Sequence, residues 1–126
     1  MSKSNFINEF IKSRNQIGAI APSSKYLAKK MLANIDFSTD LYIVELGPGT
    51  GVFTSRLLRR MSPNSKLLSL ELNPYFASKI RKSVKDRRFQ LRCDSAENIN
   101  IVLKQIQFPK VDYIISSLPL AYFLQD

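Results

Sequence analysis

One glycine-rich segment constrains the fold of this chain more than any other feature. The sequence VELGPGTG, residues 44–51, follows a predicted strand and opens a predicted helix. Glycines at alternate positions permit a tight turn and let the backbone approach a ligand closely, while free amides at a helix start favour an anionic or electron-rich group. The simpler interpretation is a strand-to-helix turn without a ligand. Its GxGxG spacing differs from the GxGxxG pattern of dinucleotide-binding turns.

Strands and helices alternate along the rest of the chain. We expect strands over residues 41–46, 66–71, 89–92 and 111–116, and helices over residues 51–61, after Pro74, and over residues 96–105. Such alternation implies parallel βαβ units with right-handed crossovers and helices on both faces of the sheet. The predicted fold class is therefore α/β, with a doubly wound parallel sheet.

Two helices are expected before the first strand. Residues 5–14 have the apolar spacing of one helix, and the Pro-Ser-Ser of residues 22–24 offers a capped start for a second helix that ends near Met31. No repeat, low-complexity tract or linker interrupts the sequence. We therefore expect one domain over residues 1–126, with residues 1–35 as an N-terminal helical segment within it.

Composition excludes several classes of site. The single cysteine, Cys93, has no internal disulfide partner, and the absence of histidine excludes a Cys/His zinc site. No continuous apolar run approaches the length of a membrane span or of a signal peptide. We expect a cytoplasmic protein without a bound metal.

The net charge of +9 is large for 126 residues and favours polyanionic partners, either nucleic acid or anionic lipid headgroups. The alternative for any one cluster, such as Arg59 with Arg60 or Arg87 with Arg88, is that it only solvates a helix face.

Two carboxylates follow the next two strands. Glu71 ends the second strand, about twenty residues beyond the turn, where a carboxylate can accept hydrogen bonds from both hydroxyls of a ribose. Asp94 follows the third strand and can accept a hydrogen bond from an adenine amino group. The ends of parallel strands form one crevice, so we expect Glu45, Glu71 and Asp94 to face one site. Alone, each acid would be read as a solvated strand-end residue.

Three segments resemble the first three motifs of class I S-adenosylmethionine-dependent methyltransferases. They are ELGPGTG at residues 45–51, LELNP at residues 70–74 and CDSAEN at residues 93–98. The resemblance covers nearly the whole chain. It implies a Rossmann-like fold and S-adenosyl-L-methionine as the cofactor.

Residue roles follow from this resemblance. Gly47, Gly49 and Gly51 should pass beneath the methionine portion of the cofactor, with Glu45 near its amino group, and Glu71 should hold the ribose.

The adenine end of the cofactor is assigned in the same way. Asp94, with the backbone of Ser95 and Ala96, should recognise adenine, and Leu72 should pack against the base.

The segment ISSLPL, residues 115–120, lies where this superfamily often places its acceptor-binding motif, which makes Ser117, Leu118 and Pro119 the expected substrate-binding residues. In the rRNA adenine dimethyltransferase group the corresponding motif is Asn-Leu-Pro followed by an aromatic residue that stacks on a flipped adenine. Here Ser117 replaces the asparagine and Leu120 the aromatic residue. These two replacements weaken the case for methylation of RNA adenine, which stays the alternative function.

Residues 14–24, together with ELGPGTG and SSLPL, are similar to bacterial phospholipid N-methyltransferases, which methylate phosphatidylethanolamine towards phosphatidylcholine. The helix of residues 5–14 has an apolar face and carries or adjoins basic residues, so it suits an anionic membrane surface. The alternative is that this face packs on the domain. The expected location is cytoplasmic and peripheral on the inner face of the membrane, with phospholipid as substrate.

No catalytic residue is assigned. Transfer to an amine needs a neutral, positioned nucleophile, and no histidine is present to deprotonate it. Tyr26 and Tyr122 are candidates for orienting the amine, although a packing role is the simpler interpretation.

Class I methyltransferases usually have seven strands, whereas this sequence provides four. We therefore expect an incomplete domain whose fourth strand leaves Ile114 and Ile115 partly exposed and promotes self-association through its edge. A non-catalytic, cofactor-binding remnant is the competing class.

Overall fold

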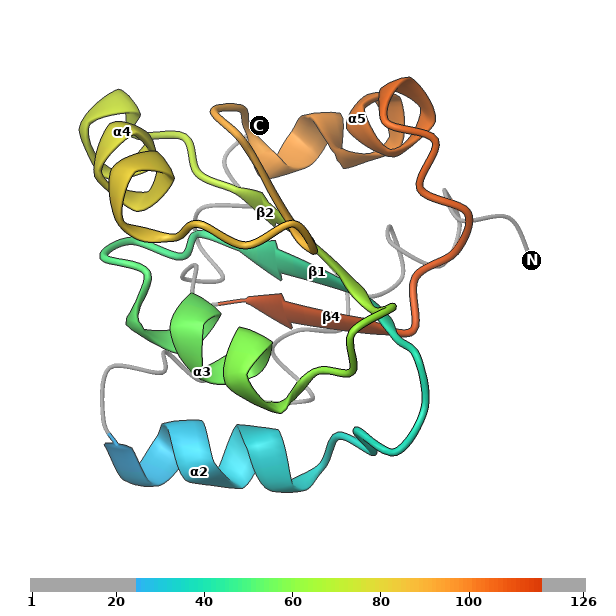
Figure 1. Cartoon of the computed structure of the whole chain (residues 1–126). Coiled ribbons are helices and arrows are strands. Elements are labelled where there is room, and N and C mark those ends of the chain that lie inside the picture. Colours follow the sequence, from blue (N-terminus) through green and yellow to red (C-terminus); the bar gives the residue numbers. More distant parts are fainter. Residues whose placement is uncertain (1–24, 117–126) are drawn as a thin grey trace.

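The structure, a computed structural model, describes residues 25–116, with side chains described from Lys29 onward. Helices and strands alternate along it (Figure 1). In chain order the elements are α2 (Lys25–Ala33), β1 (Tyr42–Leu46), α3 (Val52–Arg60), β2 (Lys66–Leu70), α4 (Pro74–Ser83), β3 (Phe89–Arg92), the 3₁₀ helix η1 (Ala96–Asn98), α5 (Ile99–Gln105) and β4 (Tyr113–Ser116).

The four strands form one parallel sheet in the order β3-β2-β1-β4. The chain steps outward from β1 to β2 and β3, and then returns to place β4 on the other side of β1. The α/β, doubly wound parallel sheet predicted from the sequence is confirmed, and its topology is Rossmann-like.

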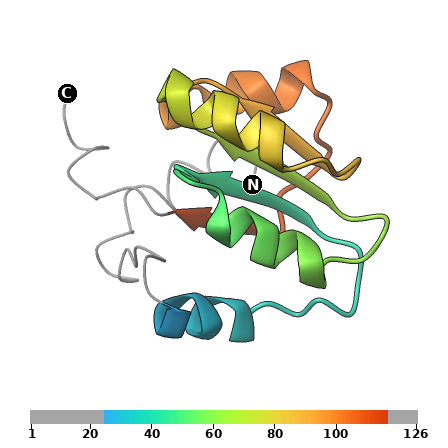
Figure 2. The same cartoon turned by 60° about the vertical axis from the view of Figure 1, so that its left-hand side comes forward.

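Helices cover both faces of this sheet (Figure 2). Alternate strand residues point to opposite faces, so Ile43 and Leu67 join a core with α2 and α3, while Val44 and Leu68 join a second core with α5. All four side chains are fully buried. The two layers of helices fix the sheet from both sides, as the alternation of strands and helices predicted.

Element boundaries agree closely with the sequence analysis, with one difference. The helix expected over residues 96–105 divides into η1 and α5. The Ser95 side chain accepts a hydrogen bond from the backbone N–H of Glu97, which favours a tight first turn before the α-helix begins. The helix expected over residues 5–14 lies outside the described residues, as do Ser117, Leu118, Pro119 and Tyr122.

The expectation that Ile114 and Ile115 are left partly exposed is wrong. Their exposed fractions are 9% and 5%, because strand side chains project from the faces of a sheet and not from its edge. Ile114 packs in the α5 core and Ile115 in the core of α2 and α3. Among residues 25–116 no strand pairs with the outer edge of β4, so its backbone groups still make self-association there a prediction.

Within the part of the chain that the structure describes, no helix is both long and apolar enough to cross a membrane.

Arg88 joins the start of β3 to the end of α3. Its guanidinium donates to the backbone oxygens of Leu58 and Met61 at 2.7 and 2.6 Å, and to that of Ser62 at 3.3 Å. It also forms a 2.7 Å ion pair with Asp86 and lowers the pKa of that carboxyl to about 2. A cation thus satisfies one carbonyl of the last turn of α3, that of Leu58, and the carbonyls of the two residues that follow the helix.

Replacing Arg88→Ala should lower the free energy of unfolding by about 2 kcal/mol, because it leaves carbonyls and a carboxylate without their charged donor. Urea denaturation followed by circular dichroism measures this change. The matched control is Arg87→Ala, which removes the neighbouring exposed arginine and should stay within about 0.5 kcal/mol. Equal effects of the two substitutions would contradict the capping role.

Candidate functional site

The glycine turn between β1 and α3 is built from left-handed backbone. Gly47, Gly49 and Gly51 have φ of 69°, 59° and 83°, values that side chains other than glycine rarely adopt. The Gly47 N–H donates to the backbone oxygen of Leu70 at 2.9 Å, which fastens the turn to the end of β2. The turn is therefore held at the carboxyl edge of the sheet.

Two of these glycines differ in what surrounds them. A Cβ on Gly51 would lie 3.2 Å from Ile80 Cγ1, so this glycine allows α4 to pack closely against the start of α3. A Cβ on Gly49 would meet nothing within 4 Å. Gly49 therefore borders open space, where a ligand can approach the backbone.

Glu71 connects the second strand to the turn. Its Oε1 accepts a hydrogen bond from the Gly49 N–H at 2.8 Å, and its Oε2 accepts one from the Asn73 N–H at 2.9 Å. The residue is 7% exposed. An ionised carboxylate has about four acceptor positions, so each oxygen keeps capacity for a further donor such as a ribose hydroxyl. The role predicted from the sequence stays a prediction, and the structure adds a bond that orders the turn.

Glu45 lies beneath the turn and is fully buried. Its Oε1 accepts hydrogen bonds from the hydroxyls of Thr54 on α3 and Ser69 on β2, at 2.6 and 2.7 Å. Its Oε2 is buried and has no partner among the described residues. Burial raises the pKa of Glu45 to about 7, although the two hydroxyls act to lower it and the charge of Glu71 raises it further.

Asp94 follows β3 and organises its own loop. Its Oδ1 accepts from the Ser95 N–H and from the Asn98 side-chain amide, both at 2.7 Å, and these bonds hold the pKa of Asp94 below its usual value, Asn98 having the larger effect. Among the described residues Oδ2 has no hydrogen-bond partner. One oxygen of an ionised carboxylate is thus left to accept a hydrogen bond.

The other predicted residues in this loop and in the loop after β2 differ in whether they can still contact a ligand. The Ser95 N–H, expected to contact adenine, is engaged by Asp94. The Ala96 side chain is buried in the α5 core, which leaves only its backbone for a ligand. Leu72 has an exposed fraction of 51%, unusual for a leucine in a packed domain, so its side chain is available to an apolar surface.

Parallel pairing brings these segments together. The Glu71 N–H donates to the backbone oxygen of Arg92 at 3.0 Å, and the Cys93 thiol lies 3.7 Å from the backbone oxygen of Leu72. The residues that follow β1, β2 and β3 therefore form one continuous edge, as expected from the sequence. Glu45 differs from Glu71 and Asp94 because it lies inside the fold and not on this edge.

Sequence reasoning missed three polar residues that support the site. They are Thr54, Ser69 and Asn73, of which the last also caps α4 by accepting from the Tyr75 N–H at 2.8 Å. A signal for Ser69 was present, because it is the only polar residue between the apolar positions of β2. The structure then pairs it in register with Glu45.

A hollow of about 320 Å³ lies at the other end of the sheet and is lined in part by Lys66, Arg87 and Phe108. It adjoins the amino ends of the strands and is separated from the glycine turn by the length of the sheet. We therefore do not assign it to the site at the carboxyl edge.

The strand order β3-β2-β1-β4 and the glycine turn after β1 define the class I S-adenosylmethionine-dependent methyltransferase fold. A ribosomal RNA adenine dimethylase family model matches residues 3–113, so the chain belongs to that family.

Solved structures agree on the fold. An O-methyltransferase from Bacillus cereus has a TM-score of 0.56 and 20% identity over 92% of this chain and 55% of its own. A Listeria monocytogenes protein assigned as an S-adenosylmethionine-dependent methyltransferase has a TM-score of 0.59 and 18% identity over 77% of this chain and 41% of its own. Identities this low show the fold alone.

Named relatives include both lipid and RNA methyltransferases. An ornithine lipid N-methyltransferase from Singulisphaera acidiphila is 30% identical over 119 residues, which are 94% of this chain and 62% of that protein. A Methanosarcina mazei protein assigned as ribosomal RNA small subunit methyltransferase A is 31% identical over 93 residues, 71% of this chain and 30% of that protein. The chain therefore spans less than two thirds of the length of either relative.

The buried Glu45 predicts a pH-dependent stability. Its pKa is about 7 in the folded chain and 4.5 for an unperturbed glutamate, so between these values the folded chain binds more protons and its free energy of unfolding falls as pH rises. The full loss is on the order of 3 kcal/mol. Urea denaturation at intervals from pH 4.5 to 8 should show this slope in the native sequence and not in Glu45→Gln.

The control for that experiment is Glu97→Gln, which removes an exposed carboxylate and should keep the slope. A slope that survives in Glu45→Gln would show that Glu45 is not its source.

Proposed function

We propose that this chain forms the cofactor-binding part of an S-adenosylmethionine-dependent N-methyltransferase whose acceptor is the amine of a phospholipid, with phosphatidylethanolamine as the expected substrate. The observation that carries the cofactor half is the open space bordered by Gly49, next to Glu71 and Asp94 on one edge. The acceptor half is supported by the similarity to an ornithine lipid N-methyltransferase and by the SSLPL sequence.

The described residues fit this cofactor in four respects. Gly49 leaves a cradle that a Cβ would partly fill, and the unpartnered Oε2 of Glu45 is a buried acceptor beneath the same turn that a cationic amino group would satisfy. Glu71 and the Oδ2 of Asp94 retain acceptor capacity for ribose hydroxyls and for an adenine amine. Leu72 offers an exposed apolar side chain to the base.

When bound, S-adenosylmethionine would supply a methyl group from its positively charged sulfur to a neutral amine, with the thioether as the leaving group and the amine proton passing to water. The chain need not provide a covalent nucleophile for such a transfer. Its described residues would act by holding the donor in place, because positioning two reactants removes much of the entropic barrier to their reaction.

A second acceptor is favoured by the family match. The matched family is described as ribosomal RNA adenine dimethylase, and adenine N6 is likewise an amine nitrogen. Against it stand Ser117 and Leu120, which replace the amide and the aromatic residue expected around a flipped base. RNA is therefore the alternative acceptor, and a cofactor-binding remnant without turnover is the alternative class.

Gly49→Ala should abolish detectable binding of S-adenosylmethionine in a calorimetric titration while costing only about 1–2 kcal/mol of stability. The added Cβ meets no protein atom within 4 Å but enters the space assigned to the ligand. Thermal unfolding of the same sample provides the control that the variant is folded. Unchanged affinity in a folded Gly49→Ala variant would contradict this placement of the cofactor.

Acceptor preference is tested by transfer of a radiolabelled methyl group. We expect the complete enzyme to label vesicles that contain phosphatidylethanolamine and the 126-residue chain alone to show weak or no transfer, and we include ornithine lipid vesicles and ribosomal RNA as parallel acceptors because of the two kinds of relatives. Label in RNA alone would overturn the lipid proposal. Cofactor binding by the complete enzyme without transfer to any of the three acceptors would favour the remnant.

A further inference from the structure

Helices α3 and α4 lie side by side on one face of the sheet (Figures 1 and 2). Their close approach is seen at Gly51, where a Cβ would lie 3.2 Å from Ile80 of α4. Their sequences, VFTSRLLRR and PYFASKIRKS, each contain three Lys or Arg residues and no Asp or Glu. The face that they form carries charge of one sign.

The two helices repeat one arrangement of side chains, all of which are exposed except the half-buried Arg56. In α3 it is Val52, Arg56 and Arg59, and in α4 it is Tyr75, Lys79 and Lys82. Both sets have the spacing i, i+4, i+7, which places their members along one stripe of a helix. Each stripe therefore begins with an apolar or aromatic residue and continues with two cations.

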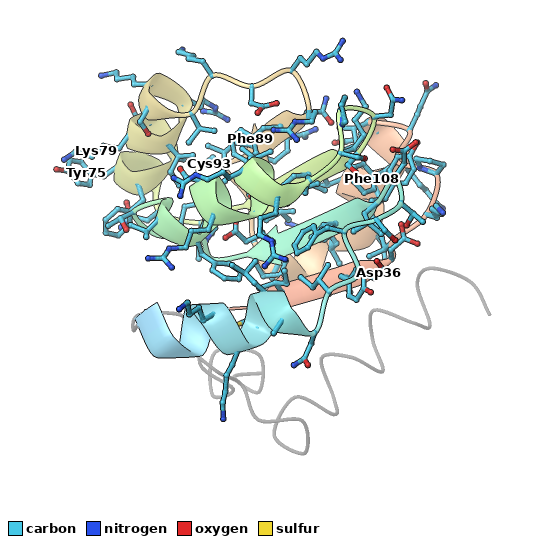
Figure 3. The ribbon with its side chains drawn as sticks, turned by 60° about the horizontal axis from the view of Figure 1, so that its bottom comes forward. Asp36, Tyr75, Lys79, Phe89, Cys93 and Phe108 are labelled. Carbon is cyan, nitrogen blue, oxygen red and sulfur yellow. The ribbon has the colours of Figure 1, made fainter. Side chains whose placement is uncertain are left out.

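Exposure supports this arrangement. Val52 and Tyr75 are 58% and 61% exposed, among the few large hydrophobic side chains so exposed in the described chain. The Lys79 ammonium lies 4.9 Å from the centre of the Tyr75 ring, and Figure 3 shows the two side chains together on the outer side of α4. Among residues 29–116, no carboxylate forms an ion pair with any of the four stripe cations.

Both stripes start near the carboxyl edge of the sheet and run away from it. Val52 directly follows the glycine turn, and Tyr75 lies in the first turn of α4, two residues after Asn73. Since crossover helices run antiparallel to the strands, both first turns lie at the carboxyl edge of the sheet. The apolar residues are thus nearest to that edge and the cations lie farther back.

We propose that this carboxyl edge docks end-on against an anionic phospholipid bilayer, with Val52 and Tyr75 at the acyl boundary and the cations of the two stripes among the lipid phosphates. Along each helix, with a rise of 1.5 Å per residue, the first cation lies about 6 Å and the second about 10 Å behind the apolar residue of that helix. The two helices are offset, because Gly51 at the start of α3 lies against Ile80 in the second turn of α4, so Tyr75 extends farther towards the bilayer than Val52. A headgroup layer is roughly 5–7 Å thick, so the cations of the two stripes lie at and behind the level of the lipid phosphates.

Charge complementarity alone would also suit RNA, whose bases can stack on an exposed tyrosine such as Tyr75, and the exposed Val52 decides between the two partners. A phosphodiester backbone has no apolar surface against which an exposed valine could pack. Burial of Val52 in a bilayer is favourable, and tyrosine is enriched at the membrane interface. Docking in this orientation also turns the carboxyl edge of the sheet, with the proposed cofactor site, towards the lipid amines. In that respect the inference rests on the proposed function and names the surface through which the enzyme reaches its substrate.

The first test is charge reversal measured by vesicle co-sedimentation. The probe is vesicles of phosphatidylglycerol and phosphatidylcholine, which lack the proposed acceptor amine. Arg59→Glu/Lys82→Glu in the 126-residue chain should lower the partition coefficient at least about tenfold at low salt. The matched control, Lys66→Glu/Lys104→Glu, changes the same charge at exposed sites away from the two stripes and should lower it about threefold or less.

The second test separates a bilayer from other polyanions. Val52→Ser should weaken vesicle binding about fivefold, whereas Ile101→Ser on α5, a residue with the same exposed fraction of 58% on the opposite face, should leave it unchanged. Circular dichroism and thermal unfolding of each variant show that it is folded. Equal effects of either matched pair, or no binding of the native sequence to the vesicles, would overturn the proposal.

The failures of the two proposals are distinguishable. Vesicle binding that depends on the stripes, in a chain that does not bind S-adenosylmethionine, supports the docking surface and refutes the proposed function. Binding of a single-stranded RNA oligomer that Arg59→Glu/Lys82→Glu weakens and Val52→Ser does not, together with no vesicle binding, assigns the surface to RNA and overturns the bilayer.

Discussion

The parallel register between β1 and β2 is the constraint on which the rest of the structure depends. It sets Leu46 opposite Leu70, so that the glycine turn leaves one strand where Glu71 leaves the next. The hydrogen bond from Gly49 to Glu71 and that from Gly47 to Leu70 are possible only in this register. A shift by one residue would turn Ser69, whose hydroxyl bonds to Glu45, to the opposite face of the sheet, so this buried polar contact and the geometry of the turn fix the same alignment.

Glu45, beneath the glycine turn, is both part of the buried core and a candidate contact for the cofactor. Glu45 is a fully buried carboxyl group, of which the hydroxyls of Thr54 and Ser69 satisfy one oxygen, while the other has no partner within residues 29–116. Such an arrangement destabilises the ionised form, which is why the pKa of Glu45 is raised to about 7. A bound cation would remove that cost, so occupancy of the proposed cofactor site and protonation of Glu45 are expected to be linked.

The helices divide the molecule into a charged face and a more neutral one. On the side of α3 and α4 the apolar residues point inward to the sheet and leave the outer stripes to cations, whereas α5 has Lys104 as its one charged residue. A net charge of +9 gives no hint of this asymmetry. The asymmetry arises because the two right-handed crossovers from β1 to β2 and from β2 to β3 place their helices on the same face.

The sequence by itself determined the α/β class, the strand and helix order and the residues that lie at the carboxyl edge of the sheet, because glycine spacing and apolar periodicity are local properties. Tertiary structure alone decided that Glu45 is buried with Thr54 and Ser69, that Ile114 and Ile115 are covered, and that Arg88 caps α3. These contacts join residues far apart in the chain. They depend on which strands become neighbours and which face a side chain points to, and neither can be read from spacing along the sequence.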